Sequence, residues 1–167
     1  MTDTPLTPAR LWKKMTAAQR LAAAQAFWND EEATDDQIQA VLLIAQQKKF
    51  RPKTVIGLDA DRKARHLASI VNLPEALSAR ALILYHLAAQ RPMMASFLDT
   101  LGIKHEDGLI QEEQVQPDAA KLPEAVAALR AAYPAEDVAL YLDTLRCQDP
   151  QTWSGLDELV TAQPTQA

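Results

Sequence analysis

The densest cluster of groups that could do chemistry is a run of cations between residues 48 and 65. It holds seven of the 17 lysines and arginines of the chain, opposed only by Asp59 and Asp61. The seven, called the basic segment below, are Lys48, Lys49, Arg51, Lys53, Arg62, Lys63 and Arg65. Cations at the end of one helix, followed by the amino end of another, can bind phosphate groups. Phe50, which lies among them, could stack on a nucleic-acid base.

A second interpretation of the basic segment is structural. Lysines and arginines at the carboxyl end of a helix complement its dipole without any ligand. The whole chain is also acidic, with a formal net charge of −5, whereas nucleic-acid-binding domains usually show a basic face and a high pI. Binding of phosphate or nucleic acid is therefore an alternative hypothesis for this chain and not the main one.

The remaining chemistry-bearing residues form no known catalytic motif. His66, His86 and His105 lack the spacing of zinc ligands, and the single Cys147 permits neither an intrachain disulfide nor a multi-cysteine metal site. The chain has four glycines and contains no phosphate-binding glycine loop and no nucleophile elbow. We therefore expect no catalytic residue, metal or cofactor. An enzyme or small-ligand binder with a pocket between helices is a further alternative.

The elements that must position these residues are predicted to be helices throughout. Glycine is scarce, and apolar residues recur at helical spacing, as at Ile38, Val41, Leu42 and Ala45. The pattern predicts an all-α fold, a compact bundle of about seven or eight helices. More than about half of the residues should be helical, well above the usual third.

Polar residues predict where several of these helices begin. A Ser, Thr, Asp or Asn side chain accepts hydrogen bonds from the first free amides, and a Glu or Gln three residues later completes a capping box. The predicted starts are Thr7-Pro8, Thr16 with Gln19, Thr34 with Gln37, Asp59 or Asp61, Asn72 with Pro74 and Glu75, and Asp149-Pro150. Gly102 is the predicted left-handed end of the helix that follows Pro92.

Three segments carry further expectations. The helix over 73–90 is apolar on most of its faces, so Leu84, Tyr85 and Leu87 are predicted to be inaccessible. The segment 51–58 interrupts the helical pattern and is predicted to hold a short extended piece at 54–56. The polar connector over 104–120 is expected to contain no more than a helical turn around 109–110.

Two stretches of the chain resemble each other. LPEALSARALILYHLAAQRPMMASFLDTL begins at Leu73, and LPEAVAALRAAYPAEDVALYLDTL begins at Leu122. Both open on Leu-Pro-Glu-Ala, are interrupted by a proline and end on Leu-Asp-Thr-Leu. The pattern is typical either of a repeated helix–Pro–helix hairpin or of Ala/Leu-rich helices with similar ends.

A true repeat makes definite demands on the structure. Pro92 and Pro134 must each lie at an inter-helix joint, since proline lacks the amide that an unbroken helix needs. Phe97 matches Tyr141 and should point into an equivalent part of the core. Asp99 and Asp143 should lie at equivalent surface positions, where paired carboxylates could serve acid–base chemistry.

Length and charge bear on domain organisation. We expect a single domain over 1–167, with a possible subdivision near 104–120. On that division, 1–103 holds the N-terminal helices with the basic segment, 121–162 holds acidic C-terminal helices, and 162–167 is a frayed tail. Residues 1–91 hold 13 lysines and arginines against 9 acidic residues, whereas residues 92–167 hold 4 against 13.

The main functional hypothesis is a non-enzymatic helical interaction or assembly module whose partner is another protein. Helical hairpins form grooves that take partner helices, and no catalytic motif competes. We expect no signal peptide and, since no window of about 20 apolar residues occurs, no membrane partner. A cytoplasmic location of bacterial type is expected, in keeping with a single cysteine.

Overall fold

A computed structural model describes residues 6–161 of the chain, and 68% of them are helical. This confirms the all-α prediction and exceeds the expected half. By the contacts within the chain, the described residues fall into two units: Thr7–Ala89, called the N-terminal unit, and Leu6 together with the residues from Gln90 onward, called the C-terminal unit. The connector over 104–120 lies inside the C-terminal unit. The predicted tail over 162–167 lies outside the described residues.

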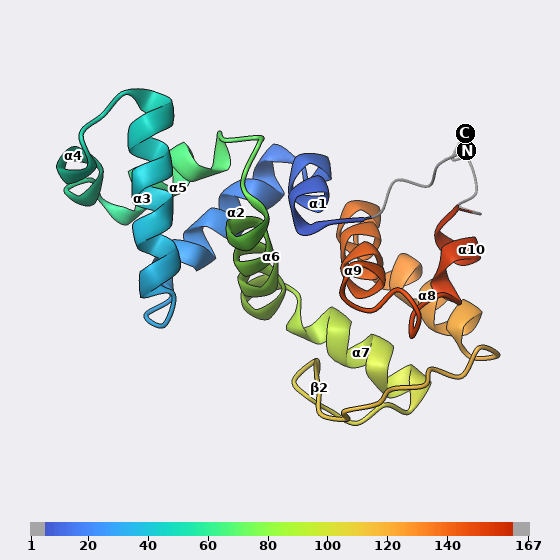
Figure 1. Ribbon diagram of the computed structural model, residues 1–167. Coiled ribbons are helices and arrows are strands. Elements are labelled where there is room, and N and C mark those ends of the chain that lie inside the picture. The colour runs from blue at the N-terminus through green and yellow to red at the C-terminus, as the bar shows by residue number, and fades with distance from the viewer. Residues whose placement is uncertain (1–5, 162–167) are drawn as a thin grey trace. The chain divides into compact units, whose positions relative to one another are not determined.

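The N-terminal unit consists of six helices built around α2. In chain order they are α1 (Pro8–Lys14), α2 (Ala17–Asn29), α3 (Thr34–Lys48), α4 (Pro52–Ile56), α5 (Ala60–Ala68) and α6 (Glu75–Ala89) (Figure 1). Helix α2 packs against α5 and α6, while α3 packs against α4, α5 and α6. Trp12, Phe27 and Ile44 are fully buried at the centre. The Trp12 Nε1–H donates to the Ile70 carbonyl at 2.7 Å, so this indole is satisfied as well as buried.

Three of the predicted helix starts are confirmed in this unit. The Thr7 and Asp59 side chains accept from the amides of Arg10 and Arg62, and Thr16 forms a complete capping box with Gln19. Each bond satisfies an amide that a helix leaves free at its amino end. The short polar side chains ahead of α1, α2 and α5 therefore set where those helices begin.

Two predicted starts are wrong. Helix α3 begins at Thr34 itself, and its N-cap is Ala33, which has no side-chain bond. Gln37 instead donates to the carbonyls of Phe27 and Asp30 at 2.9 and 2.8 Å, so it stabilises the end of α2. Glu75 accepts from the Ala9 amide at 3.2 Å and not from the start of its own helix. In both places the side chain that was predicted to cap its own helix bonds the backbone of another segment instead.

The predicted extended piece at 54–56 is also wrong. These residues belong to α4, a helix of one to two turns that begins at Pro52. Proline is well suited to the first turn because that turn uses no amide from it. Val55 is fully buried and holds α4 against its neighbours, whereas the next residue, Ile56, is 61% exposed.

Helix α6 is less buried than predicted. Tyr85 is buried, but Leu84 and Leu87 are only half-buried, and Ile83 is 41% exposed. The N-terminal helices α1, α2 and α3 cover one side of α6. The apolar sequence of α6 therefore indicated that the helix belongs to the core. It did not show that neighbouring helices cover every face of it.

The C-terminal unit holds four helices and a small β-hairpin. They are α7 (Arg91–Leu101), β1 (His105–Glu106), β2 (Leu109–Ile110), α8 (Leu122–Ala132), α9 (Ala135–Gln148) and α10 (Leu156–Thr161). Helix α7 packs against α8, and α9 packs against α8 and α10. The predicted start at Asp149-Pro150 is wrong, because residues 150–155 form turns and α10 begins only at Leu156.

The hairpin replaces the helical turn that was expected around 109–110. Strands β1 and β2 are antiparallel, with Glu106 opposite Leu109, so Asp107 and Gly108 form the two-residue loop. Both loop residues have positive φ, 50° and 90°. A Cβ at position 108 would come within 2.7 Å of the Met94 Cβ, so glycine also allows the loop to lie against α7. Asp-Gly is a strong signal for such a turn.

The two similar stretches meet some demands of a repeat and fail another. Pro92 lies in the first turn of α7 and Pro134 is the N-cap of α9, so both prolines lie at helix joints as predicted. Gly102 ends α7 in the left-handed conformation, and Ile103 N–H donates to the Leu98 carbonyl. Asp99 and Asp143 are not equivalent, because Asp99 is exposed and Asp143 is buried.

None of the described helices is both long enough and apolar enough to span a lipid bilayer.

Candidate functional site

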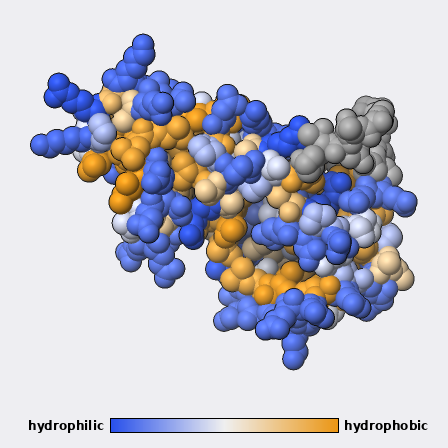
Figure 2. All heavy atoms as spheres, viewed as in Figure 1, coloured by the Kyte–Doolittle hydropathy of each residue, from blue (hydrophilic) through white to orange (hydrophobic). Residues whose placement is uncertain are grey.

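The N-terminal unit carries an open apolar groove with a volume of about 360 Å³. The side chains that line it come from α2, α3, α4 and α5, and we call it the apolar groove. The lining residues are Trp28, Thr34, Gln37, Ile38, Val41, Leu42, Pro52, Ile56, Ala60 and Lys63. Figure 2 shows hydrophobic residues gathered over α3 and α4 and edged by hydrophilic side chains.

Three large aliphatic side chains around this groove are unusually exposed. Ile38 is 52% exposed, Leu42 is 48% and Ile56 is 61%. Single exposed aliphatics are common on protein surfaces, whereas a group of them around one depression is less usual. Ile38 and Leu42 are thus exposed although they share a helical stripe with Val41 and Ala45, which are buried.

The reason is the width of the apolar arc on α3. Ala40 and Ile44 are fully buried on one side of the helix, while Ile38 and Leu42 lie one turn apart on another side. Together these positions cover more than half of the helix circumference at 3.6 residues per turn. The neighbouring helices bury only part of that arc, and the surplus faces the groove.

A smaller depression lies on the other side of the exposed face of α3. It has a volume of about 270 Å³, and its lining includes Leu42, Leu43, Pro74 and Leu77. Leu42 borders both depressions. The exposed face of α3 therefore separates two apolar surfaces of the same unit.

Trp28 and Lys63 form one wall of the apolar groove. The Lys63 Nζ lies 5.4 Å from the centroid of the Trp28 ring, within the range of a cation–π interaction. Both side chains are half-buried. The Trp28 Nε1 is covered and has no hydrogen-bond partner among the described residues. A cation is thus held directly beside the apolar lining.

The structure places Lys63 in the wall of the apolar groove and divides the other six cations of the basic segment into two groups. Arg62 and Arg65 on α5 are paired with the only nearby acids, Asp59 at 3.9 Å and Asp61 at 2.8 Å. The other group follows the end of α3 into α4. Its members are all exposed, and none forms an ion pair within the described part of the chain: Lys48, Lys49, Arg51 and Lys53.

Backbone conformation helps to present these cations. Lys49 ends α3 in the left-handed conformation, with φ 58°, which is unfavourable for a residue with a Cβ. Arg51 is the N-cap of α4, and Pro52 follows it into the lining of the groove. Arg51 and Lys53 therefore flank a groove residue in the chain.

Phe50 is not placed as a free stacking platform. Its ring meets His66 edge to face, with centroids 5.5 Å apart.

His86 is buried in α6. His105 Nε2 lies 2.6 Å from Asp99 Oδ1, and its Nδ1 accepts from the Gly108 amide at 3.1 Å. The His105 contacts tie the hairpin to the end of α7.

The two matched aspartates do not come together as an acid–base pair. Asp143 is buried on α9 and bonds Arg146 at 3.0 Å, and Arg146 also reaches Asp157 of α10 at 2.8 Å. Because Arg146 bonds both aspartates, this network links α9 to α10. Cys147, the single cysteine, lies half-buried on the same helix. No group of three metal-ligating side chains occurs among residues 6–161.

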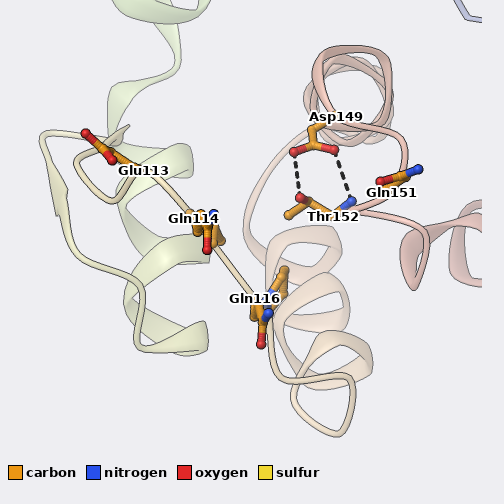
Figure 3. Close-up of a pocket in the computed structure, with 8 residues that line it drawn as sticks. Glu113, Gln114, Gln116, Asp149, Gln151 and Thr152 are labelled. Carbon is orange, nitrogen blue, oxygen red and sulfur yellow. Dashed lines mark hydrogen bonds between the residues drawn. The ribbon is translucent and has the colours of Figure 1, made fainter.

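The C-terminal unit contains a polar pocket of about 420 Å³ between the connector and the turn after α9. Figure 3 shows Glu113, Gln114 and Gln116 along the connector, with Asp149 and Thr152 across from them. Both Asp149 oxygens are occupied, by the Thr152 hydroxyl at 2.6 Å and its amide at 3.1 Å. The Thr152 hydroxyl, followed by its amide, lowers the pKa of the Asp149 carboxyl below its ordinary value. An acid held ionised in this way caps a turn and is unsuited to proton donation.

Sequence reasoning singled out the cations and missed the groove beside them. The available signal was α3 itself, where Leu42, Leu43 and Ile44 follow one another within a stripe that already contained Ile38 and Val41. A helix in one layer of a small unit cannot bury so wide an arc. The pairing of α3 with the short helix α4, however, is a tertiary arrangement that no local pattern indicated.

No model of a protein family matches this chain, and no curated protein or solved structure shows significant similarity to it.

Proposed function

We propose that the chain is a non-enzymatic interaction module whose N-terminal unit takes an amphipathic helix of another protein in the apolar groove. The observation that carries the proposal is the exposure of Ile38, Leu42 and Ile56 around one depression. Partner helices bind such grooves through apolar side chains spaced i, i+3/i+4 and i+7. The compartment we propose is the cytoplasm, where a lone reduced Cys147 is stable.

The residue types that line the groove favour binding of a macromolecular partner over catalysis of a reaction. The lining is mainly aliphatic and holds no histidine, no carboxylate and no cysteine, and its one titratable side chain, Lys63, lies over the Trp28 ring. Nucleophilic or acid–base catalysis needs a titratable group beside the reacting atoms. The polar pocket of the C-terminal unit does not supply an alternative, since its Asp149 is engaged as a cap.

The test is selection of peptides from a displayed library of helical sequences, about six turns long, on the immobilised full chain. Selected peptides should bind the wild type and change the emission of Trp28, which lines the groove, whereas Trp12 and Trp153 are buried. The variant Ile38→Ser/Leu42→Ser/Ile56→Ser should lose at least about tenfold in affinity, or about 1.4 kcal/mol.

A matched control lies in the same unit. Val71 and Ile83 are 46% and 41% exposed and do not line the apolar groove. The variant Val71→Ser/Ile83→Ser should bind the selected peptides as the wild type does. Failure to select any helical peptide, or equal binding by the groove variant, would overturn the proposed function.

A further inference from the structure

Resting on the proposed function, we infer that the partner helix is acidic. Its apolar face fills the apolar groove, and carboxylates beside that face pair with Lys53 and Lys63. The inference assigns the chemistry of the partner, which the exposed aliphatics alone do not. It rests on which cations border the groove and which of them already have acids.

The cations nearest the groove are the ones without acids. Lys63 lines the groove, and Arg51 and Lys53 flank the lining residue Pro52. Asp59 and Asp61 are taken by Arg62 and Arg65. Of the two acids on α3, Asp36 pairs with Arg80 at 2.8 Å, whereas Asp35 is exposed and forms no ion pair within the described part of the chain. The groove border at α4 and α5 therefore carries uncompensated positive charge, which complements an acidic partner.

Lys63 joins the two parts of the recognition surface. Its ammonium lies over the Trp28 ring, and that ring forms part of the apolar lining. A carboxylate placed beside Lys63 would pair with an ammonium that is already half-buried and oriented. Ion pairs of this kind fix partner choice and orientation more than they add affinity.

A second copy of this chain is a poor occupant. Among the described residues of the C-terminal unit, the only exposed large hydrophobic side chain is Leu109, so its acidic helices offer no apolar face to fill the groove. Two N-terminal units facing groove to groove would place Lys53 and Lys63 against the same cations of the other copy. Like charges in such a contact are unfavourable.

Nucleic acid is also a poorer fit than an acidic helix. Single strands bind through aromatic faces that stack on bases, together with cations for phosphates. Here Phe50 packs against His66, and Lys63 lies over the Trp28 ring. The groove between the cations is lined by aliphatic side chains, which offer a phosphate neither a charge nor a hydrogen-bond donor.

The experiment uses the same helical peptide library, now with a fully randomised polar face. We expect the selected peptides to be rich in Asp and Glu beside their apolar positions. The charge reversal Lys53→Glu/Lys63→Glu should weaken an acidic peptide by at least about tenfold. The matched reversal Lys13→Glu/Lys14→Glu, at exposed positions of α1 outside the groove, should weaken it by less than about threefold.

The outcomes separate the two proposals. Selected helices that need Ile38, Leu42 and Ile56 but are neutral or basic would overturn the acidic assignment and leave the proposed function standing. Equal weakening by both charge reversals would overturn it too, since only the overall field would then matter. Peptides that bind without the groove would overturn both proposals.

Two further arms test the other occupants. Salt-sensitive binding of mixed RNA or DNA that is lost on charge reversal at Lys49 and Arg51, and kept in the groove variant, would overturn the assignment of these cations to an acidic protein. Sedimentation of the full chain over a range of concentrations tests self-association. A dimer that dissociates in the Ile38→Ser/Leu42→Ser/Ile56→Ser variant would overturn the choice of a foreign helix.

Discussion

The rings of Phe97 and Tyr141 meet edge to face in the core of the C-terminal unit, with centroids 5.5 Å apart and planes at 86°. They occupy matching positions in the two similar stretches and both are buried. Each single change to alanine should cost about 3–5 kcal/mol by cavity formation. A double-mutant cycle by denaturant unfolding should give a coupling of about 0.5–1.5 kcal/mol. Additive effects would show that the two rings are not in contact.

Tyr141 should make the protein sensitive to alkali. Burial raises the pKa of its hydroxyl above the ordinary value of 10.0, so the folded state disfavours the tyrosinate. The stability it contributes is fully present below pH 10, and it is lost as the pH rises above the pKa of the unfolded chain. Tyr141→Phe should therefore flatten the decline in the free energy of unfolding above pH 10. A decline in Tyr141→Phe as steep as that of the wild type would contradict the prediction.

Two leucines of α6 should respond differently to truncation. Leu82 is 2% exposed, and Leu82→Ala should cost about 2–5 kcal/mol. Leu84 is only half-buried, so Leu84→Ala should cost less, about 1 kcal/mol. Chemical denaturation of both variants measures the difference. A larger loss at Leu84 than at Leu82 would contradict the arrangement of α6 described above.

Lys63 should shield the ring of Trp28. The ammonium lies over that ring, and such a contact at a partly exposed site contributes about 0.5–1 kcal/mol. Lys63→Ala should therefore raise the quenching of Trp28 emission by acrylamide, with a loss of stability no greater than that amount. Lys53→Ala, on α4, is the control and should leave the quenching unchanged. The same result for both lysines would mean that Lys63 does not cover the indole.

The fold class could be predicted because it depends on local chemistry. Helical spacing of apolar residues and the caps at Thr7, Thr16, Asp59 and Gly102 act within a few residues of themselves, and all four are found as predicted. The hairpin was within reach of the same reasoning. Its Asp107-Gly108 loop is a known turn signal that lay unused in a connector judged only by its polarity.

The exposure of apolar side chains could not be predicted in the same way. Periodicity shows that Ile38 and Leu42 share a face with one another, but it does not show whether a neighbour covers that face. The same limit applies to Leu84, whose helix has a buried side and a partly open one. Asp143 shows the reverse case, because it is a charged residue that is buried. Its partner Arg146 also bonds Asp157, which follows the turns after α9. Coverage is a tertiary property, so the groove emerged only from the structure.

At Lys49, the backbone is left-handed, so the residue that would most stabilise the fold differs from the residue that supplies charge for recognition. Glycine adopts this conformation at little steric cost, so a search for heat-resistant variants would favour it there over lysine. The same replacement would remove one of the exposed cations that follow the end of α3. A version of this protein stabilised for use as a scaffold would therefore tend to lose positive charge from the group of cations that leads towards the groove border, a trade between stability and activity.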